Sequence, residues 1–101
     1  MFKHQLRALV QLGKFESFLG AAAAFNEVAT RLELPTYRFF VTVFGDLNEV
    51  WAEADFDSLD EHWTRFRAAH EEPSFQSAFS ELCSYLVPGS AHDKVMELLI
   101  G

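Results

Sequence analysis

The stretch that decides the fold is residues 37–56, YRFFVTVFGDLNEVWAEADF. Apolar and polar residues alternate through most of it, which is typical of strands that bury one face. A turn over residues 45–48 would fold the stretch into a hairpin. Asp-Leu is not a preferred two-residue turn, so a longer loop stays open as an alternative. The sequence therefore predicts two antiparallel strands joined by a loop near Gly45.

The register of this hairpin follows by counting if Phe44 lies opposite Glu49. One face then carries only apolar pairs, which are Tyr37 with Phe56, Phe39 with Ala54, Val41 with Ala52, and Val43 with Val50. The other face pairs Arg38 with Asp55, Phe40 with Glu53, and Thr42 with Trp51. A slip of one residue would turn the apolar set of a strand outward, so the pattern specifies which face is buried.

Two segments precede the hairpin. Residues 3–12 alternate with period two, placing His4, Leu6 and Ala8 on one face, and this predicts a strand. Residues 14–34 instead repeat their apolar positions every three or four residues, which predicts an amphipathic helix. Pro35 disfavours a helical conformation at the residue before it, so we expect this helix to end there.

Two segments follow the hairpin. Ser58 and Glu61 have the spacing of a capping box, which predicts a second helix. Its apolar pattern is interrupted at Pro73 and then resumes. Residues 94–100 are short and apolar, and we interpret them as a final strand. The order β-α-β-β-α-β predicts one domain over residues 1–101, an α+β ferredoxin-like fold with a four-stranded antiparallel sheet and two helices on one face.

The second face of the predicted sheet mixes charged and aromatic residues, among them Arg7, Arg38, Phe40, Thr42, Trp51 and Glu53. We interpret this set as a dimer interface, because pairing two such faces would bury the aromatic rings and let the charges pair. The alternative is a solvated sheet face that carries scattered aromatic residues.

Composition excludes several classes of function. The formal net charge of −7 argues against binding to nucleic acid and to anionic membranes. A single cysteine, Cys83, cannot form an internal disulfide, and no metal-binding spacing of cysteine and histidine is present, so we expect no metal and no cofactor. Arg7 interrupts the apolar core that a signal peptide needs, and no apolar run reaches the length of a membrane span. We expect a soluble cytoplasmic protein.

Five short stretches resemble the dimeric α/β-barrel superfamily, and most nearly its NIPSNAP-like and antibiotic-biosynthesis-monooxygenase-like branches. They are LGKFESF (12–18), VFGDLNEV (43–50), FDSLDE (56–61), EPSFQ (72–76) and VPGS (87–90). The resemblance covers nearly the whole chain. It implies a homodimer whose two sheets form a barrel, and in each subunit a pocket between helices and sheet for a small apolar or aromatic ligand.

Candidate site residues follow from where that pocket is expected. His62 on the second helix is a candidate general base, since a neutral imidazole accepts a proton near pH 7. Trp63 is a candidate for stacking on an aromatic ligand, and Tyr37 for donating a hydrogen bond to a ligand oxygen. Each also has a purely structural interpretation, as a capping histidine or as core and interface aromatic residues.

The function implied by the resemblance is that of a cofactor-free monooxygenase, cyclase or isomerase. A non-catalytic ligand-binding protein, or a structural or interaction protein of the NIPSNAP-like type, is the alternative. The haem-degrading branch of the superfamily carries an iron-ligating histidine on the second helix. The matching position here is Phe79, which argues against haem chemistry, although His62 and His70 stay open as ligands.

Overall fold

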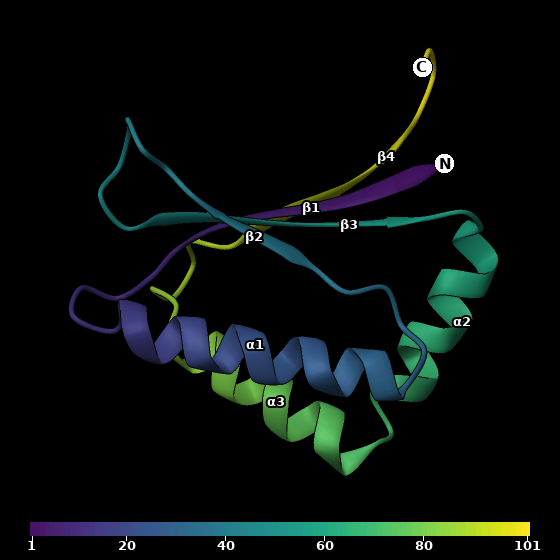
Figure 1. Ribbon diagram of the computed structural model, residues 1–101, viewed down its shortest axis with the longest axis horizontal. Coiled ribbons are helices and arrows are strands. Elements are labelled where there is room, and N and C mark those ends of the chain that lie inside the picture. The colour runs from purple at the N-terminus through teal and green to yellow at the C-terminus, as the bar shows by residue number, and fades with distance from the viewer.

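The computed structural model describes all residues, 1–101, and contains four strands and three helices. In chain order they are β1 (Phe2–Leu9), α1 (Phe15–Arg31), β2 (Arg38–Val41), β3 (Glu49–Phe56), α2 (Leu59–Ala69), α3 (Pro73–Ser84) and β4 (His92–Glu97). The strands form one antiparallel sheet in the order β2-β3-β1-β4. All three helices lie on one face of this sheet (Figure 1). The structure confirms the ferredoxin-like fold, with the predicted second helix divided into α2 and α3.

The central hairpin has the predicted buried face but a different register. Phe39 pairs with Ala52 and Val41 with Val50, two residues away from the predicted partners. A shift of two keeps every side chain on its predicted face, and burial alternates strictly along β3. The predicted register was wrong because β2 ends at Val41 and residues 42–48 form a longer loop. A tight turn at Asp-Leu is not formed.

Helix α1 ends earlier than predicted, at Arg31. The Leu34 backbone N–H donates to the Ala29 carbonyl oxygen at 2.8 Å, and Glu33 adopts a φ of 58°. This is the geometry of a helix end closed by a left-handed residue, a position that usually holds glycine. The closure turns the chain so that Leu34 is buried and residues 35–37 lead directly into β2.

The second helical segment begins as predicted. The Ser58 hydroxyl accepts a hydrogen bond from the Glu61 backbone N–H at 3.2 Å, so the cap of α2 is formed. Pro73 occupies the first turn of α3, where its missing N–H costs nothing. The final strand lies at residues 92–97, slightly earlier than predicted, and its side chains are all exposed because no helix covers this edge of the sheet. No helix in the chain combines the length and the apolar composition needed to cross a membrane.

The buried core divides into two clusters. One joins the three helices through Phe25, Val28, Ala29, Leu34, Ala69 and Phe75. The other joins α1 to the sheet through Ala8, Val10, Phe18 and Val50. Leu82 of α3 packs against both clusters. The space between them, beneath the small side chain of Ala52, is where the candidate site lies.

Candidate functional site

A small apolar cavity lies between the sheet and the helices. Its volume is about 70 Å³. The residues that line it are His4, Leu6, Phe25, Tyr37, Phe39, Ala52, Phe66, Phe79 and Leu82. An engineered core cavity of about 150 Å³ holds one benzene molecule, so an aromatic ligand here requires a side chain to move. Phe79 on α3 is 38% exposed, more than the other lining side chains, and is therefore the one that we expect to move outward.

The polar groups of this cavity form a chain of three side chains. The Tyr37 hydroxyl lies 2.5 Å from Nδ1 of His4, and Nε2 of His4 lies 3.0 Å from an Asp93 carboxylate oxygen. The three residues come from β2's leading segment, β1 and β4 respectively, so the sheet order brings them together. The His4 side chain is only 17% exposed, whereas Asp93 at the sheet edge is 64% exposed. The chain therefore links the cavity to solvent.

Hydrogen-bond chemistry allows two directions for this chain, which differ in the protonation of His4. An ionised Asp93 can only accept, so Nε2 of His4 carries a proton. With neutral His4, Nδ1 accepts from the Tyr37 hydroxyl, whose oxygen is left to accept from a ligand. With protonated His4, both nitrogens donate, and the Tyr37 hydroxyl is released to donate to a ligand oxygen. The chain can therefore move a proton in either direction between the cavity and His4.

Tyr37 is held in place by its backbone and kept neutral by its surroundings. The Asn26 side chain of α1 donates to the Tyr37 carbonyl oxygen and accepts from the Tyr37 N–H, both at 2.8 Å. Burial, with a smaller contribution from the charge of Asp93, raises the pKa of Tyr37 to about 12. The hydroxyl thus remains a proton donor throughout the physiological pH range.

The raised pKa of Tyr37 predicts a loss of stability in alkali. An unfolded tyrosine ionises near pH 10, whereas folded Tyr37 ionises at about 12. Its contribution is complete below pH 10 and is lost as the pH rises from 10 through 12. Two pKa units correspond to about 2.7 kcal/mol. Urea unfolding should show this extra loss in the unmodified chain and not in Tyr37→Phe, and identical pH profiles for the two would contradict it.

His62 lies on α2 between this cavity and the surface. Its ring stacks on Phe56 with 3.9 Å between centroids, and its Nδ1 atom is buried without a hydrogen-bond partner. Desolvation, and secondarily the neighbouring His4, lower the pKa of His62. The imidazole is therefore neutral at neutral pH and able to accept a proton. His62 and Tyr37 both line a narrow gap of about 10 Å³ adjoining the cavity.

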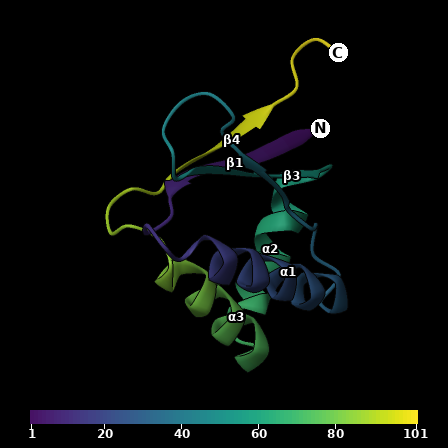
Figure 2. The same ribbon diagram turned by 60° about the vertical axis from the view of Figure 1, so that its left-hand side comes forward.

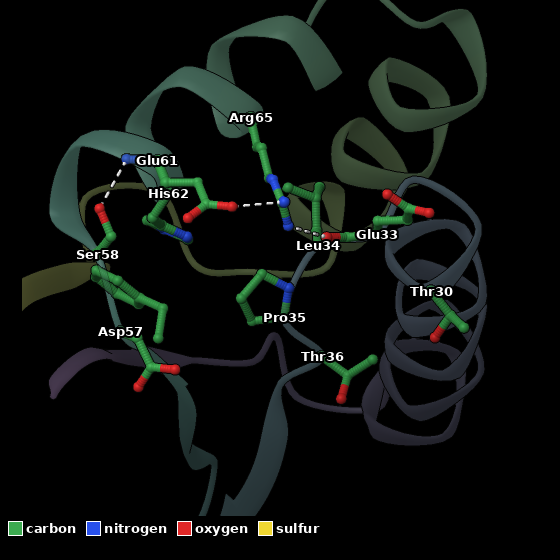
Figure 3. A pocket seen from close by; sticks show the side chains of 11 residues that line it. Thr30, Glu33, Leu34, Pro35, Thr36, Asp57, Ser58, Glu61, His62 and Arg65 are labelled. Atoms are coloured by element: carbon green, nitrogen blue, oxygen red, sulfur yellow. Dashed lines mark hydrogen bonds and ion pairs between the residues drawn. The ribbon is translucent and has the colours of Figure 1, made fainter.

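A larger, polar pocket of about 500 Å³ opens on the other side of His62. Figure 3 shows its walls, with Ser58, Glu61, His62 and Arg65 of the α2 region facing the segment from Glu33 to Thr36. Arg65 pairs with Glu61 at 2.5 Å and donates to the Glu33 carbonyl oxygen at 3.3 Å. The Arg65 side chain therefore ties α2 to the end of α1 across this pocket.

The structure brings together two of the three residues proposed from the sequence. Tyr37 and His62 share the gap, whereas Trp63 is 55% exposed and lines none of these hollows. Cζ of Arg67 lies 5.8 Å from the centroid of the Trp63 ring. From the sequence, His4 could be either a pocket group or part of a frayed strand end, and Asp93 was not considered for the site. The position of His4 on the apolar face of a strand was a signal for it, but nothing local indicates Asp93.

The second sheet face, which the sequence marks as an interface, is open in this chain, since no helix covers it (Figures 1 and 2). Its charges pair within the chain around two carboxylates. Glu49 accepts from the Trp51 indole, Arg7 and the Thr42 hydroxyl, and these bonds lower the pKa of Glu49.

Glu53 is the second of these carboxylates. It accepts from Gln5 at 2.8 Å and from Lys3 at 3.2 Å, and Arg38 lies 3.5 Å away. The hydrogen bond from Gln5, followed by the bond and charge of Lys3, lowers the pKa of Glu53. Arg38 also pairs with Asp55 at 3.3 Å, diagonally across the hairpin. The face therefore holds few charges in need of a partner, while Phe40 remains 47% exposed.

No arrangement of three or more histidine, cysteine or acidic side chains in the chain is suited to hold a metal ion. No protein-family model matches the sequence, and no curated protein matches it. Solved structures do match. A NIPSNAP family protein from Agrobacterium tumefaciens str. C58 is 20% identical, with a TM-score of 0.77 over 97% of this chain and 85% of its own.

Two further structures extend the comparison. An uncharacterised NIPSNAP domain protein from Burkholderia xenovorans is 16% identical, with a TM-score of 0.80 over 98% of this chain and 95% of its own. An antibiotic biosynthesis monooxygenase is 11% identical, with a TM-score of 0.75 over 99% of this chain and 100% of its own. The chain thus has the fold shared by these two groups, which confirms the resemblance expected from its sequence at the level of the fold.

Proposed function

We propose that the chain catalyses proton transfer on a small aromatic ligand in the apolar cavity, without a cofactor. With His4 in its protonated form, Tyr37 accepts from His4 and donates to the ligand oxygen, and His62 accepts the proton that leaves the ligand carbon. The observation that carries this proposal is the Tyr37–His4–Asp93 chain, which ends in an otherwise apolar cavity. Proton removal is common to the isomerase, cyclase and cofactor-free monooxygenase hypotheses, and of these only the monooxygenase needs a second substrate, dioxygen.

The pKa shifts of the two groups support this assignment. Burial raises the pKa of Tyr37, so it stays protonated, and desolvation lowers the pKa of His62, so it stays neutral. Paired groups whose surroundings move their pKa values apart are typical of an acid and a base in one site. Both side chains line the gap that adjoins the cavity, so a ligand in the cavity has to extend into this gap to meet His62 as well as Tyr37. Trp63 has no role in this scheme.

The proposal is tested with 2-indanone, a small ketone whose benzylic α-protons exchange with solvent after enolisation. Enolisation breaks one α C–H bond, with the proton passing to His62, and the oxygen gains a hydrogen bond or proton from Tyr37. Deuterium uptake measured by proton NMR in D₂O should be faster with the protein than in buffer alone. Uptake at the buffer rate, with the ketone bound, would contradict catalysis.

A non-catalytic ligand-binding role is the second candidate. The small volume of the cavity and the existing bond between Tyr37 and His4 favour it, because a ligand must displace side chains before it meets the polar groups. Binding of 2-indanone without accelerated exchange is the result that this role predicts.

We also propose that the chain forms a homodimer through its helix-free sheet face. The loop after β2 and the C-terminal tail both project to that side of the sheet in both views (Figures 1 and 2). Their tips are apolar and exposed, with Phe44 95% exposed and Leu99 91% exposed. Together with Phe40, these segments offer apolar area to a second copy of the chain. Because the charges on this face pair within the chain, its burial leaves few of them unsatisfied.

Replacing Phe40 with aspartate is expected to weaken this dimer by about 50-fold or more, since an unpaired carboxylate would be placed in the interface. Sedimentation equilibrium measures the dimerisation constant directly. Leu19→Asp is the matched control, because Leu19 on α1 is 45% exposed on the helical side and should leave the constant unchanged. A monomeric unmodified chain, or equal effects of the two changes, would count against this interface.

A further inference from the structure

Three hollows on the helix side of the sheet share their walls. The apolar cavity shares Phe25, Tyr37 and Phe66 with the narrow gap. The gap in turn shares Leu34, Pro35 and His62 with the polar pocket. The gap holds only about 10 Å³, against about 70 Å³ for the cavity and about 500 Å³ for the pocket. The three hollows therefore form one series, with its narrowest point beside His62.

The His62 ring at this narrow point is held by packing alone. It stacks on Phe56, and its buried Nδ1 has no hydrogen-bond partner. A buried polar atom without a partner is costly to a folded protein. A ligand group that passes through the gap and bonds to Nδ1 would remove that cost. No hydrogen bond fixes the imidazole, so passage of a ligand through the gap requires only that its packing on Phe56 be disturbed.

The polar pocket beyond His62 has an excess of negative charge. Arg65 is its only cationic side chain at neutral pH, and it is paired with Glu61. The carboxylates of Glu33 and Asp57 have no ion-pair partner in the chain. Hydroxyl groups of Thr30, Thr36 and Ser58 complete the polar wall (Figure 3). These surroundings favour an ammonium group and oppose a carboxylate.

We propose that the three hollows are one binding site for an elongated ligand, with an aromatic ring in the cavity beside Tyr37 and a positively charged tail in the polar pocket beyond His62. This rests on the proposed function, which places the ring in the cavity. A ligand with an aromatic ring and an ammonium tail belongs to the class of arylalkylamines. The ring still needs a lining side chain of the cavity to move, whereas the tail lies outside the cavity of about 70 Å³.

Three compounds that share a phenol ring test this inference. Phenol has no tail, tyramine has an ammonium tail, and 4-hydroxyphenylacetate has a carboxylate tail. In NMR titrations of the ¹⁵N-labelled chain, tyramine should bind about tenfold more tightly than phenol, and 4-hydroxyphenylacetate more weakly than phenol. Phenol should shift amide signals around Phe39 only, and tyramine those around both Phe39 and Ser58.

Two variants locate the tail. Asp57→Asn should lower the affinity for tyramine about threefold and leave that for phenol unchanged. Asp60→Asn is the matched control, because it removes the same charge at the same end of α2 but does not line the pocket. His62→Trp should fill the gap and reduce tyramine binding to the level of phenol.

The outcomes separate this inference from the function on which it rests. Phenol binding in the cavity with no gain for tyramine, or equal losses in Asp57→Asn and Asp60→Asn, would overturn the elongated site and leave the proposed function standing. Tyramine shifts confined to the polar pocket, with no binding of phenol, would overturn both. Binding of neither compound would likewise contradict both.

Discussion

Replacing Phe75 with alanine is expected to lower the free energy of unfolding by about 3–5 kcal/mol, a large part of the stability of a domain of this size. The Phe75 side chain is 0% exposed. The centroid of its ring lies 5.5 Å from that of Phe25, 5.7 Å from that of Phe66 and 5.0 Å from that of His70. It therefore joins all three helices, and its removal leaves a void that none of them can close alone.

Urea unfolding followed by circular dichroism measures this loss. Phe79→Ala is the matched control, because its ring stacks on Phe75 at 5.9 Å but is 38% exposed. Phe79→Ala should lower the free energy of unfolding by about 1–2 kcal/mol, because the Phe79 ring buries less apolar area and its partly exposed surroundings can relax around the smaller side chain. Equal losses for the two variants would show that the helices are not held together at Phe75.

The fold could be predicted because its information is local. Alternation in residues 37–56 specified which face of the hairpin is buried. A change of register by two residues leaves the same side chains on that face, so this prediction did not depend on the exact loop length. The register itself could not be predicted, because it depends on how residues 42–48 close, and that loop contains no strong turn signal. Likewise the end of α1 depends on Glu33 adopting a left-handed conformation that only its tertiary setting stabilises.

The candidate site could be predicted only in part, for a related reason. Tyr37 and His62 were found because each lies on an element expected to border the space between helices and sheet. Asp93 could not be found, since it is 89 residues from His4 in sequence and meets it only through the pairing of β1 with β4. Trp63 is one position along α2 from His62, and that step turns it to the outside of the helix.

Replacing Tyr37 with phenylalanine is expected to reduce the protein-dependent exchange of the α-protons of 2-indanone by about 10²-fold or more. The developing enolate oxygen would lose its hydrogen bond from Tyr37 in a largely apolar cavity, where a hydrogen bond to charge is worth most. The ring of Tyr37 still packs against Phe25 in this variant, at 6.0 Å between centroids, so the fold should be kept. Asp93→Asn should give a smaller loss, about tenfold, because His4 keeps a hydrogen-bond partner at Nε2 but that partner is no longer a carboxylate.

Tyr85→Phe is the matched control for this experiment. The Tyr85 hydroxyl bonds only to Glu81 on the surface of α3 and does not line the cavity, so exchange should proceed at the unmodified rate. His62→Phe tests the other half of the scheme, since it keeps the stacking on Phe56 while removing the base. If His62→Phe loses exchange and Tyr37→Phe does not, the carbonyl is polarised by some other group. If Tyr37→Phe alone loses it, the proton leaves to water, and the buried Nδ1 of His62 serves binding instead.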